Sequence, residues 1–246
     1  MPPLPGSSVS WTSHVRAVEV APSLYAADFW NLGAQIDALL DAGTRIFHFD
    51  VGDGHFVPPV TIGPIVIESI APRVHEGGAL IDVHLMATEP ERHFDAVAAA
   101  GGDSVTFHYE VVHKPQRAIA AARELGLGAG IAFNPETEPE AVAEVAGGVD
   151  LVLCMSIHPG YSGQEFMPEA LDRIERLHRL LPETLIQVDG GVGKGNAHDL
   201  NEAGARLLVA GTAIFAAPDI GDAYRQIHAA ALDAAGAEPD VARAVT

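Results

Sequence analysis

Short apolar runs rich in β-branched residues alternate with alanine-rich helical stretches along almost the whole chain. The predicted strands cover eight segments: Ala17–Ala21, Thr44–Asp50, Ala79–Leu85, Ser104–His108, Gly128–Phe133, Leu151–Ile157, Leu185–Asp189 and Leu207–Ala210. The predicted helices lie near residues 29–42, 64–73, 90–100, 115–125, 138–146, 168–181, 194–203 and 219–234. Several strands are apolar at nearly every position, which is typical of parallel strands buried on both faces. The repeat therefore predicts an α/β fold, a single-domain (β/α)8 TIM barrel.

A doubly wound open sheet is the main alternative for a chain of repeated strand and helix units. Such a sheet normally carries a glycine-rich fingerprint after its first strand, whereas this chain reads Ala21-Pro22-Ser23-Leu24-Tyr25 there. No linker divides the chain. We expect a flexible N-terminal tail over residues 1–14, the barrel over residues 15–234 and a frayed C-terminal tail over residues 235–246. The first residues lack the basic and apolar regions of a signal peptide.

The charge balance limits the classes of partner. Acidic residues number 33 against 14 basic ones, and the formal net charge of −19 disfavours nucleic acid and anionic membranes. No apolar run approaches the ~18 residues that suggest a membrane span. The two lysines, Lys114 and Lys194, argue against Schiff-base chemistry, which needs a lysine in the pocket. The single Cys154 excludes an intrachain disulfide and favours a reducing, cytoplasmic location.

Polar side chains gather at the carboxyl ends of the predicted strands, where barrels hold their active sites. His48 and Asp50 stand two residues apart in the second strand, so both leave the same face. Asp82 and His84 repeat this spacing in the third strand, and Asp189 ends the seventh. Each of them alone is also consistent with an ordinary hydrogen-bonded or turn residue. Together, histidine and aspartate at the same end of three strands favour a divalent-metal site.

Other strand ends add polar groups whose purpose the sequence leaves open. Ser23 follows the first strand, and Met155 and Ser156 belong to the end of the sixth. His108 and Glu110 end the fourth strand. For these two residues, a supporting role behind the metal ligands and a purely structural role are equally compatible with the sequence.

Glycines after the last two strands give an independent signal. Gly190 and Gly191 follow the seventh strand, and Gly211 with Thr212 follows the eighth. Barrels often bind phosphate at these positions, on backbone N–H groups and a helix N-terminus. Glycine allows the backbone to approach the phosphate oxygens closely, and the loop from Gly160 to Gly163 offers further donors. The pattern favours a phosphate-bearing ligand and requires no arginine.

Motifs distributed along the chain resemble those of the ribulose-phosphate 3-epimerase family. The resemblance extends from about Val18 to about Phe215. The motifs that carry it are Ala21-Pro22-Ser23-Leu24, Ala27-Asp28-Phe29, Asp53-Gly54-His55-Phe56-Val57-Pro58, Asp82-Val83-His84-Leu85-Met86, Asn134-Pro135, Met155-Ser156, Pro159-Gly160, Val188-Asp189-Gly190-Gly191-Val192 and Ala210-Gly211. Several of them in this order are specific to the family and its close sugar-phosphate epimerase relatives.

The resemblance implies a barrel that epimerises D-ribulose 5-phosphate to D-xylulose 5-phosphate at C3 through an ene-diolate. It implies one divalent metal ion, Zn, Fe, Mn or Co, held by His48, Asp50, His84 and Asp189. It also implies that Asp50 and Asp189 are the catalytic acid/base groups, on opposite faces of the substrate. The implied substrate-binding residues are Ser23, His84, Met86, Met155, Gly160, Tyr161, Ser162, Gly163, Gly190, Gly191, Gly211 and Thr212. The implied partners are a ketose phosphate substrate and further copies of the chain, in a homo-oligomer.

The chain departs from the family pattern at a few positions. Gly52 stands where the family usually has methionine, and Ser162 where it usually has glycine. Tyr161 for phenylalanine and Thr212 for serine are milder changes, and His158 lies at a variable position. A missing side chain at Gly52 would enlarge the pocket, which makes the longer substrate D-allulose 6-phosphate an alternative.

Two alternatives of another class also stand beside the epimerase. One is a barrel that binds a phosphate sugar without catalysis, and retention of both predicted catalytic carboxylates argues against it. The other is a metal-free lyase or decarboxylase. Such sites usually recruit a lysine, and neither lysine of this chain lies at the end of a predicted strand.

Overall fold

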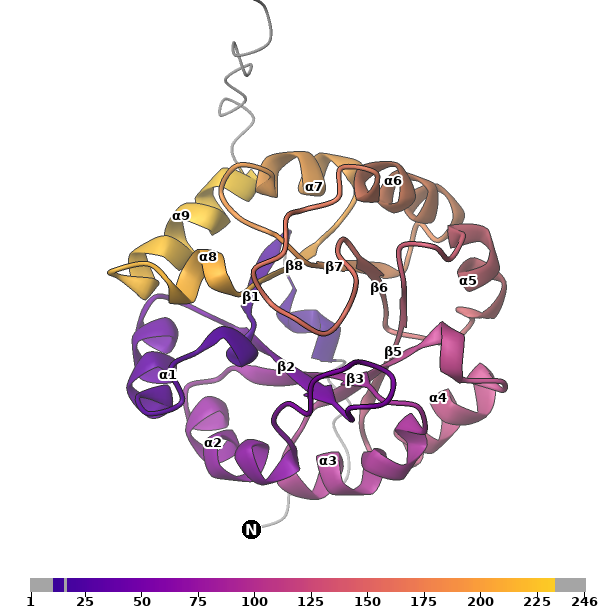
Figure 1. The fold of residues 1–246 in the computed structure, drawn as a ribbon, viewed down its shortest axis with the longest axis horizontal. Helices are drawn as coiled ribbons and strands as arrows, with labels where there is room; N and C mark the ends of the chain where they lie inside the picture. The colour runs from indigo at the N-terminus through magenta and orange to yellow at the C-terminus, as the bar shows by residue number, and fades with distance from the viewer. Residues whose placement is uncertain (1–10, 16, 233–246) are drawn as a thin grey trace, which may run out of the picture.

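A ring of helices surrounds a barrel of parallel strands (Figure 1) in the computed structural model, which describes residues 11–15 and 17–232. The strands are β1 (Glu19–Pro22), β2 (Ile46–Gly52), β3 (Leu80–Met86), β4 (Ser104–His108), β5 (Gly128–Phe133), β6 (Leu151–Met155), β7 (Leu185–Asp189) and β8 (Leu207–Ala210). The α-helices are α1 (Leu32–Asp41), α2 (Pro64–Glu76), α3 (Phe94–Ala100), α4 (Pro115–Glu124), α5 (Pro139–Val145), α6 (Ala170–Leu180), α7 (Ala197–Ala203), α8 (Thr212–Phe215) and α9 (Ile220–Leu232). Short 3-10 helices are η1 (Trp11–His14), η2 (Leu24–Ala26), η3 (Pro90–His93) and η4 (Tyr109–Val111).

The strands close into a barrel. Each strand pairs in parallel with its neighbour in the order β1-β8-β7-β6-β5-β4-β3-β2. A parallel bridge between Ser23 and His48 then joins the end of β1 to β2 and completes the circle. The predicted TIM barrel is confirmed, and the open-sheet alternative is wrong because an open sheet has two unpaired edges.

Most predicted elements lie where the sequence places them, with differences at their ends. Strands β4, β5, β7 and β8 have the predicted bounds, whereas β2 continues two residues further than predicted, to Gly52. The helix predicted near 90–100 is divided into η3 and α3, and the short helix α8 was not predicted. Both differences concern segments of four residues, η3 and α8. A single turn of helix is too short to leave a periodic pattern in the sequence.

Proline and glycine mark the ends of several helices. Pro64, Pro115 and Pro139 each occupy the first turn of a helix, where the missing N–H costs nothing and the fixed φ angle suits the helix. Gly101 and Gly204 end α3 and α7 with φ angles of 95° and 115°. This left-handed conformation closes a helix at little cost only for glycine.

The pleat of β2 shows how the fold divides side chains between two layers. Phe47 and Phe49 belong to the apolar layer between the strands and the outer helices. Ile46 instead packs in the interior of the barrel. Because side chains alternate along a strand, His48 and Asp50 point into the interior with Ile46. The same alternation in β3 and β7 directs further polar side chains toward the barrel axis.

Trp11 fills the amino end of the barrel. Its side chain is buried, packs with Ile46 and Leu151 inside the barrel, and donates from Nε1 to Asp150 Oδ2 at 3.1 Å. Gly128 makes room for it, since a Cβ at that position would lie 2.0 Å from Trp11 Nε1. The expected N-terminal tail over residues 1–14 thus includes four residues that form η1 and pack on the barrel.

The remaining boundary predictions fall on residues that the structure does not describe. Residues 1–10 of the expected N-terminal tail and the whole expected C-terminal tail over 235–246 lie outside the described residues. Helix α9 is described as far as Leu232. Within the described part of the chain, every helix is too short or too polar to span a membrane.

Candidate active site and metal centre

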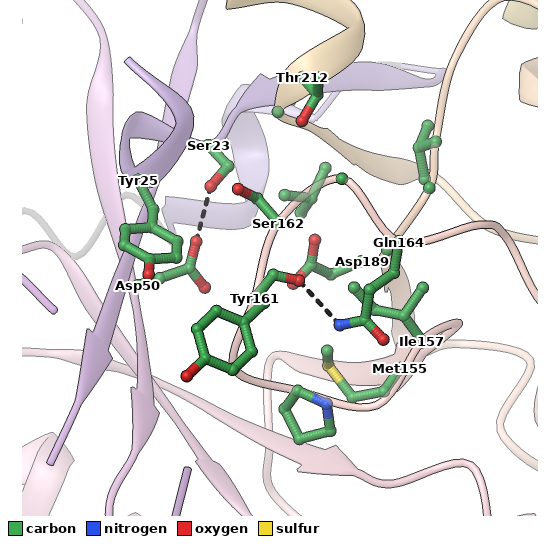
Figure 2. A pocket seen from close by; sticks show the side chains of 18 of the residues that line it. Ser23, Tyr25, Asp50, Met155, Ile157, Tyr161, Ser162, Gln164, Asp189 and Thr212 are labelled. Carbon is green, nitrogen blue, oxygen red and sulfur yellow. Dashed lines mark hydrogen bonds between the residues drawn. The ribbon is translucent and has the colours of Figure 1, made fainter. Parts of the chain in front are cut away.

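A pocket of about 290 Å³ opens at the carboxyl ends of the strands (Figure 2). The residues that line it are Ser23, Tyr25, Asp50, Met86, Met155, Ile157, Pro159, Gly160, Tyr161, Ser162, Gly163, Gln164, Asp189, Gly190, Gly191, Val192, Gly193, Val209, Gly211, Thr212 and Ala213. The list contains both predicted catalytic residues and every predicted substrate-binding residue except His84. His84 is fully buried and lies behind Asp50 instead.

Four ligand atoms converge at the inner end of this pocket. One atom from each of His48, Asp50, His84 and Asp189 lies within 4.8 Å of the other three. Strands β2, β3 and β7 supply them, so residues far apart in the sequence meet only because the barrel closes. Two imidazoles and two carboxylates form a donor set suited to a divalent cation such as Zn, Fe, Mn or Co.

The unsatisfied nitrogen of His48 indicates how such a cation would be held. His48 Nε2 is buried and makes no hydrogen bond, although Asp50 Oδ1 is only 3.2 Å away. A buried polar atom without a partner normally costs about 1–3 kcal/mol. A lone pair on this nitrogen, beside two carboxylates, is suited to binding a cation. The residues present therefore fit a metal ion.

The other nitrogen of His48 is fixed by a carboxylate. Its Nδ1 lies 3.0 Å from Asp82 Oδ2, and Asp82 also accepts from Ser104 Oγ at 2.6 Å and Gln187 Nε2 at 2.7 Å. Asp82 is an acceptor only, so it keeps a proton on Nδ1 of the imidazole, and Nε2 is the nitrogen available to a cation. A carboxylate behind a histidine in this way is typical of metal sites.

His84 is supported through a second histidine. Its Nδ1 lies 3.0 Å from Asp50 Oδ1, and its Nε2 lies 2.9 Å from His108 Nε2. His108 Nδ1 is in turn 3.2 Å from Glu110 Oε2. Both histidines are fully buried. Burial lowers the pKa of His108 to about 4, an effect that exceeds the opposing influence of Glu110. His108 is therefore neutral near neutral pH.

The two pocket carboxylates have different electrostatic surroundings. Burial disfavours the charge on Asp50, but the adjacent His48 and His84 outweigh that effect and hold its pKa well below the usual range. Burial, together with the charge of Asp50, raises the pKa of Asp189 to about 6. Burial also disfavours the imidazolium form of His48, yet Asp50 and Asp82 keep its pKa raised. Asp50 therefore stays ionised, whereas Asp189 accepts a proton more readily.

Ser23 links the barrel closure to Asp50. Its Oγ donates to Asp50 Oδ2 at 2.6 Å, a contact that Figure 2 shows at the edge of the pocket. The bridge between Ser23 and His48 places this hydroxyl beside β2. The carboxylates of Asp50 and Asp189 face each other across the pocket in the same view.

The glycine-rich end of the pocket has a backbone that only glycine can form. Gly190 and Gly191 have φ angles of 122° and 63°. A Cβ on Gly190 would lie 2.4 Å from Ile157 Cγ1, and one on Gly191 would lie 2.6 Å from Phe166 N. Their backbone is thus fixed and accessible from the pocket. Among the described residues that line the pocket there is no lysine and no arginine.

The loop after β6 meets the turn after β8 at this end of the pocket. A Cβ on Gly163 would lie 3.7 Å from Thr212 Oγ1, so the two segments approach each other closely. Tyr161 is more than half exposed at the rim. Gln164 holds the loop together, since its Nε2 donates to the carbonyl oxygens of His158 and Tyr161 at 2.8 Å each.

The expectation that Gly52 enlarges the pocket is wrong. Gly52 does not line the pocket, and it packs against the loop that follows β2. A Cβ at this position would lie 2.9 Å from both Pro59 O and Val57 Cγ2, and 3.1 Å from Thr61 Cγ2. The space that a larger side chain would need is filled by the loop. The glycine therefore gives no reason to expect a longer substrate.

Sequence reasoning missed several residues of the pocket wall. Tyr25, Ile157, Val192 and Val209 line the pocket but belong to apolar segments that resemble any barrel strand or loop. Gln187 had a usable signal, because it lies two residues before Asp189 and thus faces the interior as Asp189 does. Neither lysine lines the pocket, as expected.

The sequence pattern of the Ribulose-phosphate 3 epimerase family matches residues 19–215, which include every strand and the whole pocket wall. The chain belongs to the ribulose-phosphate 3-epimerase family. The residues grouped in the pocket, Asp50 and Asp189 among them, all fall within the matched segment.

Members of the ribulose-phosphate 3-epimerase family match most of this chain. The ribulose-phosphate 3-epimerase of Bacillus subtilis is 40% identical over 216 residues, which cover 86% of this chain and 98% of that protein. The Escherichia coli ribulose-phosphate 3-epimerase is 41% identical over 204 residues, covering 81% of this chain and 90% of that protein. The solved structure of 3-hexulose-6-phosphate synthase from Salmonella typhimurium superposes with a TM-score of 0.69 over 87% of this chain and 99% of that one. At 18% identity, that likeness concerns the barrel fold alone.

Proposed function

We propose that the protein catalyses the epimerisation of D-ribulose 5-phosphate to D-xylulose 5-phosphate. Membership of the family supports this proposal, and one observation carries the chemistry. Two carboxylates, Asp50 and Asp189, face each other across a pocket whose other end is built from glycine-rich turns. The pocket can thus hold an anionic group at one end and exchange a proton at the other.

The reaction inverts the carbon beside the ketone. One carboxylate removes the C3 proton from one face of the sugar, and the electron pair of the C–H bond forms the ene-diolate. The opposite carboxylate, which starts protonated, delivers its proton to the other face of C3. The first carboxylate ends protonated and the second ionised, so charge and protons balance. A positioned acid/base group contributes about 10²–10⁴-fold to such a step.

His48, Asp50, His84 and Asp189 would hold the divalent metal ion. When bound, the ion would stabilise the negative charge of the ene-diolate, an effect worth several kcal/mol. The chain's own residues keep the ligands in place, because Asp82 fixes the proton of His48 and Ser23 donates to the second oxygen of Asp50. These contacts orient the two side chains that approach the reacting carbon from β2.

The phosphate of the substrate would bind at the turns after β7 and β8 and at the loop after β6. Backbone N–H groups near Gly191 and Gly211, with the hydroxyls of Ser162 and Thr212, provide the donors. The helix α8 has only four residues, so the donors are the amides of the turns rather than a helix dipole. Backbone amides suit a phosphate in this pocket, since its lining carries no cationic side chain among the described residues.

A comparison of substrates tests the assignment. Purified, metal-replete protein is expected to convert D-ribulose 5-phosphate to D-xylulose 5-phosphate at a much higher kcat/KM than it acts on D-allulose 6-phosphate. Turnover of the hexulose phosphate without turnover of the pentose phosphate would contradict the proposal. Binding of both compounds without turnover of either would favour a non-catalytic barrel.

We also propose that the chain forms a homo-oligomer, as the family resemblance implies. Large apolar side chains such as Trp30, Val60 and Ile65 are highly exposed around the start of α1 and α2. Light scattering after gel filtration is expected to give an integer multiple, greater than one, of 25.8 kDa. A mass of one chain at micromolar concentration would exclude a stable oligomer.

A further inference from the structure

We propose that His108 and Glu110 are positioning residues that keep the proton of His84 on Nε2, so that its Nδ1 lone pair stays free for the metal ion. The proposal rests on the metal centre proposed above. It concerns a chain of hydrogen bonds that runs from β3 across β4 to the loop after β5. Its members lie outside the pocket lining, and the epimerisation steps do not use His108 or Glu110.

Glu110 determines which atom donates in each hydrogen bond of this series. Its Oε1 accepts from Asn134 N at 2.7 Å and from Thr137 Oγ1 at 2.5 Å. Its Oε2 is therefore the oxygen left for His108 Nδ1, which lies 3.2 Å away. A carboxylate can only accept, so His108 carries its proton on Nδ1. A neutral imidazole has one proton, and Nε2 of His108 is then an acceptor.

The contact between the two histidines makes the proton position on His84 depend on that of His108. The Nε2 atoms of His84 and His108 are 2.9 Å apart, a distance at which one proton lies between them. Because His108 Nε2 accepts, His84 Nε2 donates. His84 then has no proton on Nδ1, the atom that faces Asp50 and the metal cluster. The contacts from His84 to His108 and from His108 to Glu110 then each pair a donor with an acceptor. His84 Nδ1 and Asp50 Oδ1, 3.0 Å apart, are both acceptors, a pair that suits a shared cation.

The packing around the two histidines prevents these hydrogen bonds from changing partners. His84 and His108 are fully buried, and their rings stack with centroids 5.0 Å apart. The ring of Phe56 also packs against His108, with ring centroids 4.5 Å apart. Water does not reach either imidazole to offer a different partner. The proton positions of the two histidines are thus set by Glu110, whose carboxylate is partly exposed.

The two histidine ligands are supported in different ways. His48 meets the carboxylate of Asp82 directly, whereas a neutral His108 separates His84 from its carboxylate. The difference gives the proposal a specific test, since the chain through His108 can be reversed by an isosteric change at Glu110. No such reversal is available at Asp82 without disturbing Ser104 and Gln187.

The test is the Glu110→Gln variant. Asn134 N and Thr137 Oγ1 would keep the amide oxygen of the new side chain, which leaves its NH2 group facing His108 Nδ1. His108 would then accept at Nδ1 and donate from Nε2, and His84 would be driven to carry its proton on Nδ1, against the metal. We expect Zn²⁺ affinity to fall by about 10–100-fold, as for loss of other partners behind metal ligands. Chelator competition measures the affinity, and the thermal midpoint checks the fold.

Glu136→Gln is the matched control. Glu136 pairs with His158 on the exposed rim, at 2.5 Å, and neither residue touches the four ligands. This variant is expected to bind Zn²⁺ as the unaltered protein does. A second measurement needs no variant: ¹⁵N NMR of the zinc-loaded protein is expected to show the His108 proton on Nδ1.

The outcomes separate the two proposals. Weaker Zn²⁺ binding by Glu110→Gln alone, with the His108 proton on Nδ1, supports the positioning role. Unchanged Zn²⁺ binding by a folded Glu110→Gln variant, or a His108 proton on Nε2, overturns the positioning role while the metal centre stands. If the unaltered protein binds no Zn²⁺, Co²⁺ or Mn²⁺, the metal centre fails and the positioning role fails with it. If Glu110→Gln does not fold, the position of the His108 proton decides.

Discussion

The two pocket carboxylates differ in the groups that surround each one. Asp50 contacts Ser23 Oγ, His84 and His48, whereas no hydrogen bond to the Asp189 carboxylate is present among the described residues. Asp50 is therefore held in one orientation and remains ionised, and Asp189 has a pKa raised to about 6 by burial and by Asp50. Such separation of two carboxylates is a known means of giving each one a different role in proton transfer.

Asparagine at either position is expected to abolish proton transfer while preserving the fold. Asp50→Asn and Asp189→Asn should each reduce kcat by at least about 10²–10⁴-fold, because an amide neither takes up nor returns the proton. Steady-state kinetics with D-ribulose 5-phosphate, together with circular dichroism, measure the two effects. Ser69→Ala is a control, since Ser69 Oγ only donates to a backbone carbonyl on α2. A variant at Asp50 or Asp189 that kept most of its activity would remove that residue from the mechanism.

Residue patterns in the sequence predicted the residues of the pocket better than the hydrogen-bond partners that hold those residues in place. His48, Asp50, His84 and Asp189 are found together because strand ends in a barrel must meet, which the repeat alone implied. Of the partners of Asp82, Gln187 could have been placed in the interior from its spacing to Asp189. The contact with Ser104 depends on how side chains pack inside the barrel. Gly52 misled for a related reason: whether a missing side chain leaves space depends on the loop packed over it.

At the scale of elements, Asp53 ties together two loops that border the active-site end. Its Oδ1 accepts from the backbone N–H groups of His55 and Phe56, and its Oδ2 accepts from Thr88 N and Thr88 Oγ1. Burial disfavours its charge, but these hydrogen bonds, first those from Thr88, lower its pKa to about 2. The loop after β2 is thereby attached to the loop after β3.

Asp53→Asn is expected to lower stability by about 1 kcal/mol, because its NH2 group would face the N–H of Thr88. A carboxyl with a lowered pKa stabilises the folded state above its unfolded pKa. That contribution disappears as the pH falls from the unfolded value of 3.8 toward the folded value of about 2. Urea unfolding should therefore show a smaller difference between variant and unaltered protein at about pH 3 than at about pH 5. An equal difference at both pH values would contradict this account.

The amino end of the barrel carries stability rather than chemistry. Trp11 fills it, and Gly128 supplies the space. Trp11→Ala should cost about 3–5 kcal/mol in the free energy of unfolding, with little change in kcat because the pocket lies at the opposite end. Gly128→Ala should destabilise the unaltered protein more than it destabilises the Trp11→Ala variant. Denaturant unfolding of the four proteins measures the coupling, and strict additivity would exclude the contact.

For the whole molecule, an anionic substrate must approach a protein with a formal net charge of −19. The pocket lining offers no cationic side chain among the described residues to attract it. Raising the ionic strength from about 10 mM to about 150 mM shortens the Debye length from about 30 Å to about 8 Å. We expect kcat/KM to rise over this range while kcat stays constant, since screening reduces long-range repulsion. A fall in kcat/KM would indicate attraction by a cationic group instead.

The barrel as a whole was the most predictable feature of the chain. Strands such as β5 and β7 had the predicted bounds because short apolar runs between turn residues leave little ambiguity. The η1 segment was not predicted, since a single turn with one tryptophan has no periodicity. The position of η1 depends on the barrel interior that Trp11 fills. The number of strand and helix repeats in the sequence implied that the sheet closes. This closure brings Ser23 beside His48.

The exchange of the C3 proton with solvent tests the central claim most directly. In D₂O, metal-replete protein acting on unlabelled D-ribulose 5-phosphate should produce D-xylulose 5-phosphate that carries deuterium at C3, because the returning proton comes from the second carboxylate. At early times the remaining substrate should keep its C3 proton. Proton NMR measures both. Product that retains the original C3 proton, or the absence of any exchange and turnover, would contradict a mechanism in which Asp50 and Asp189 act on opposite faces.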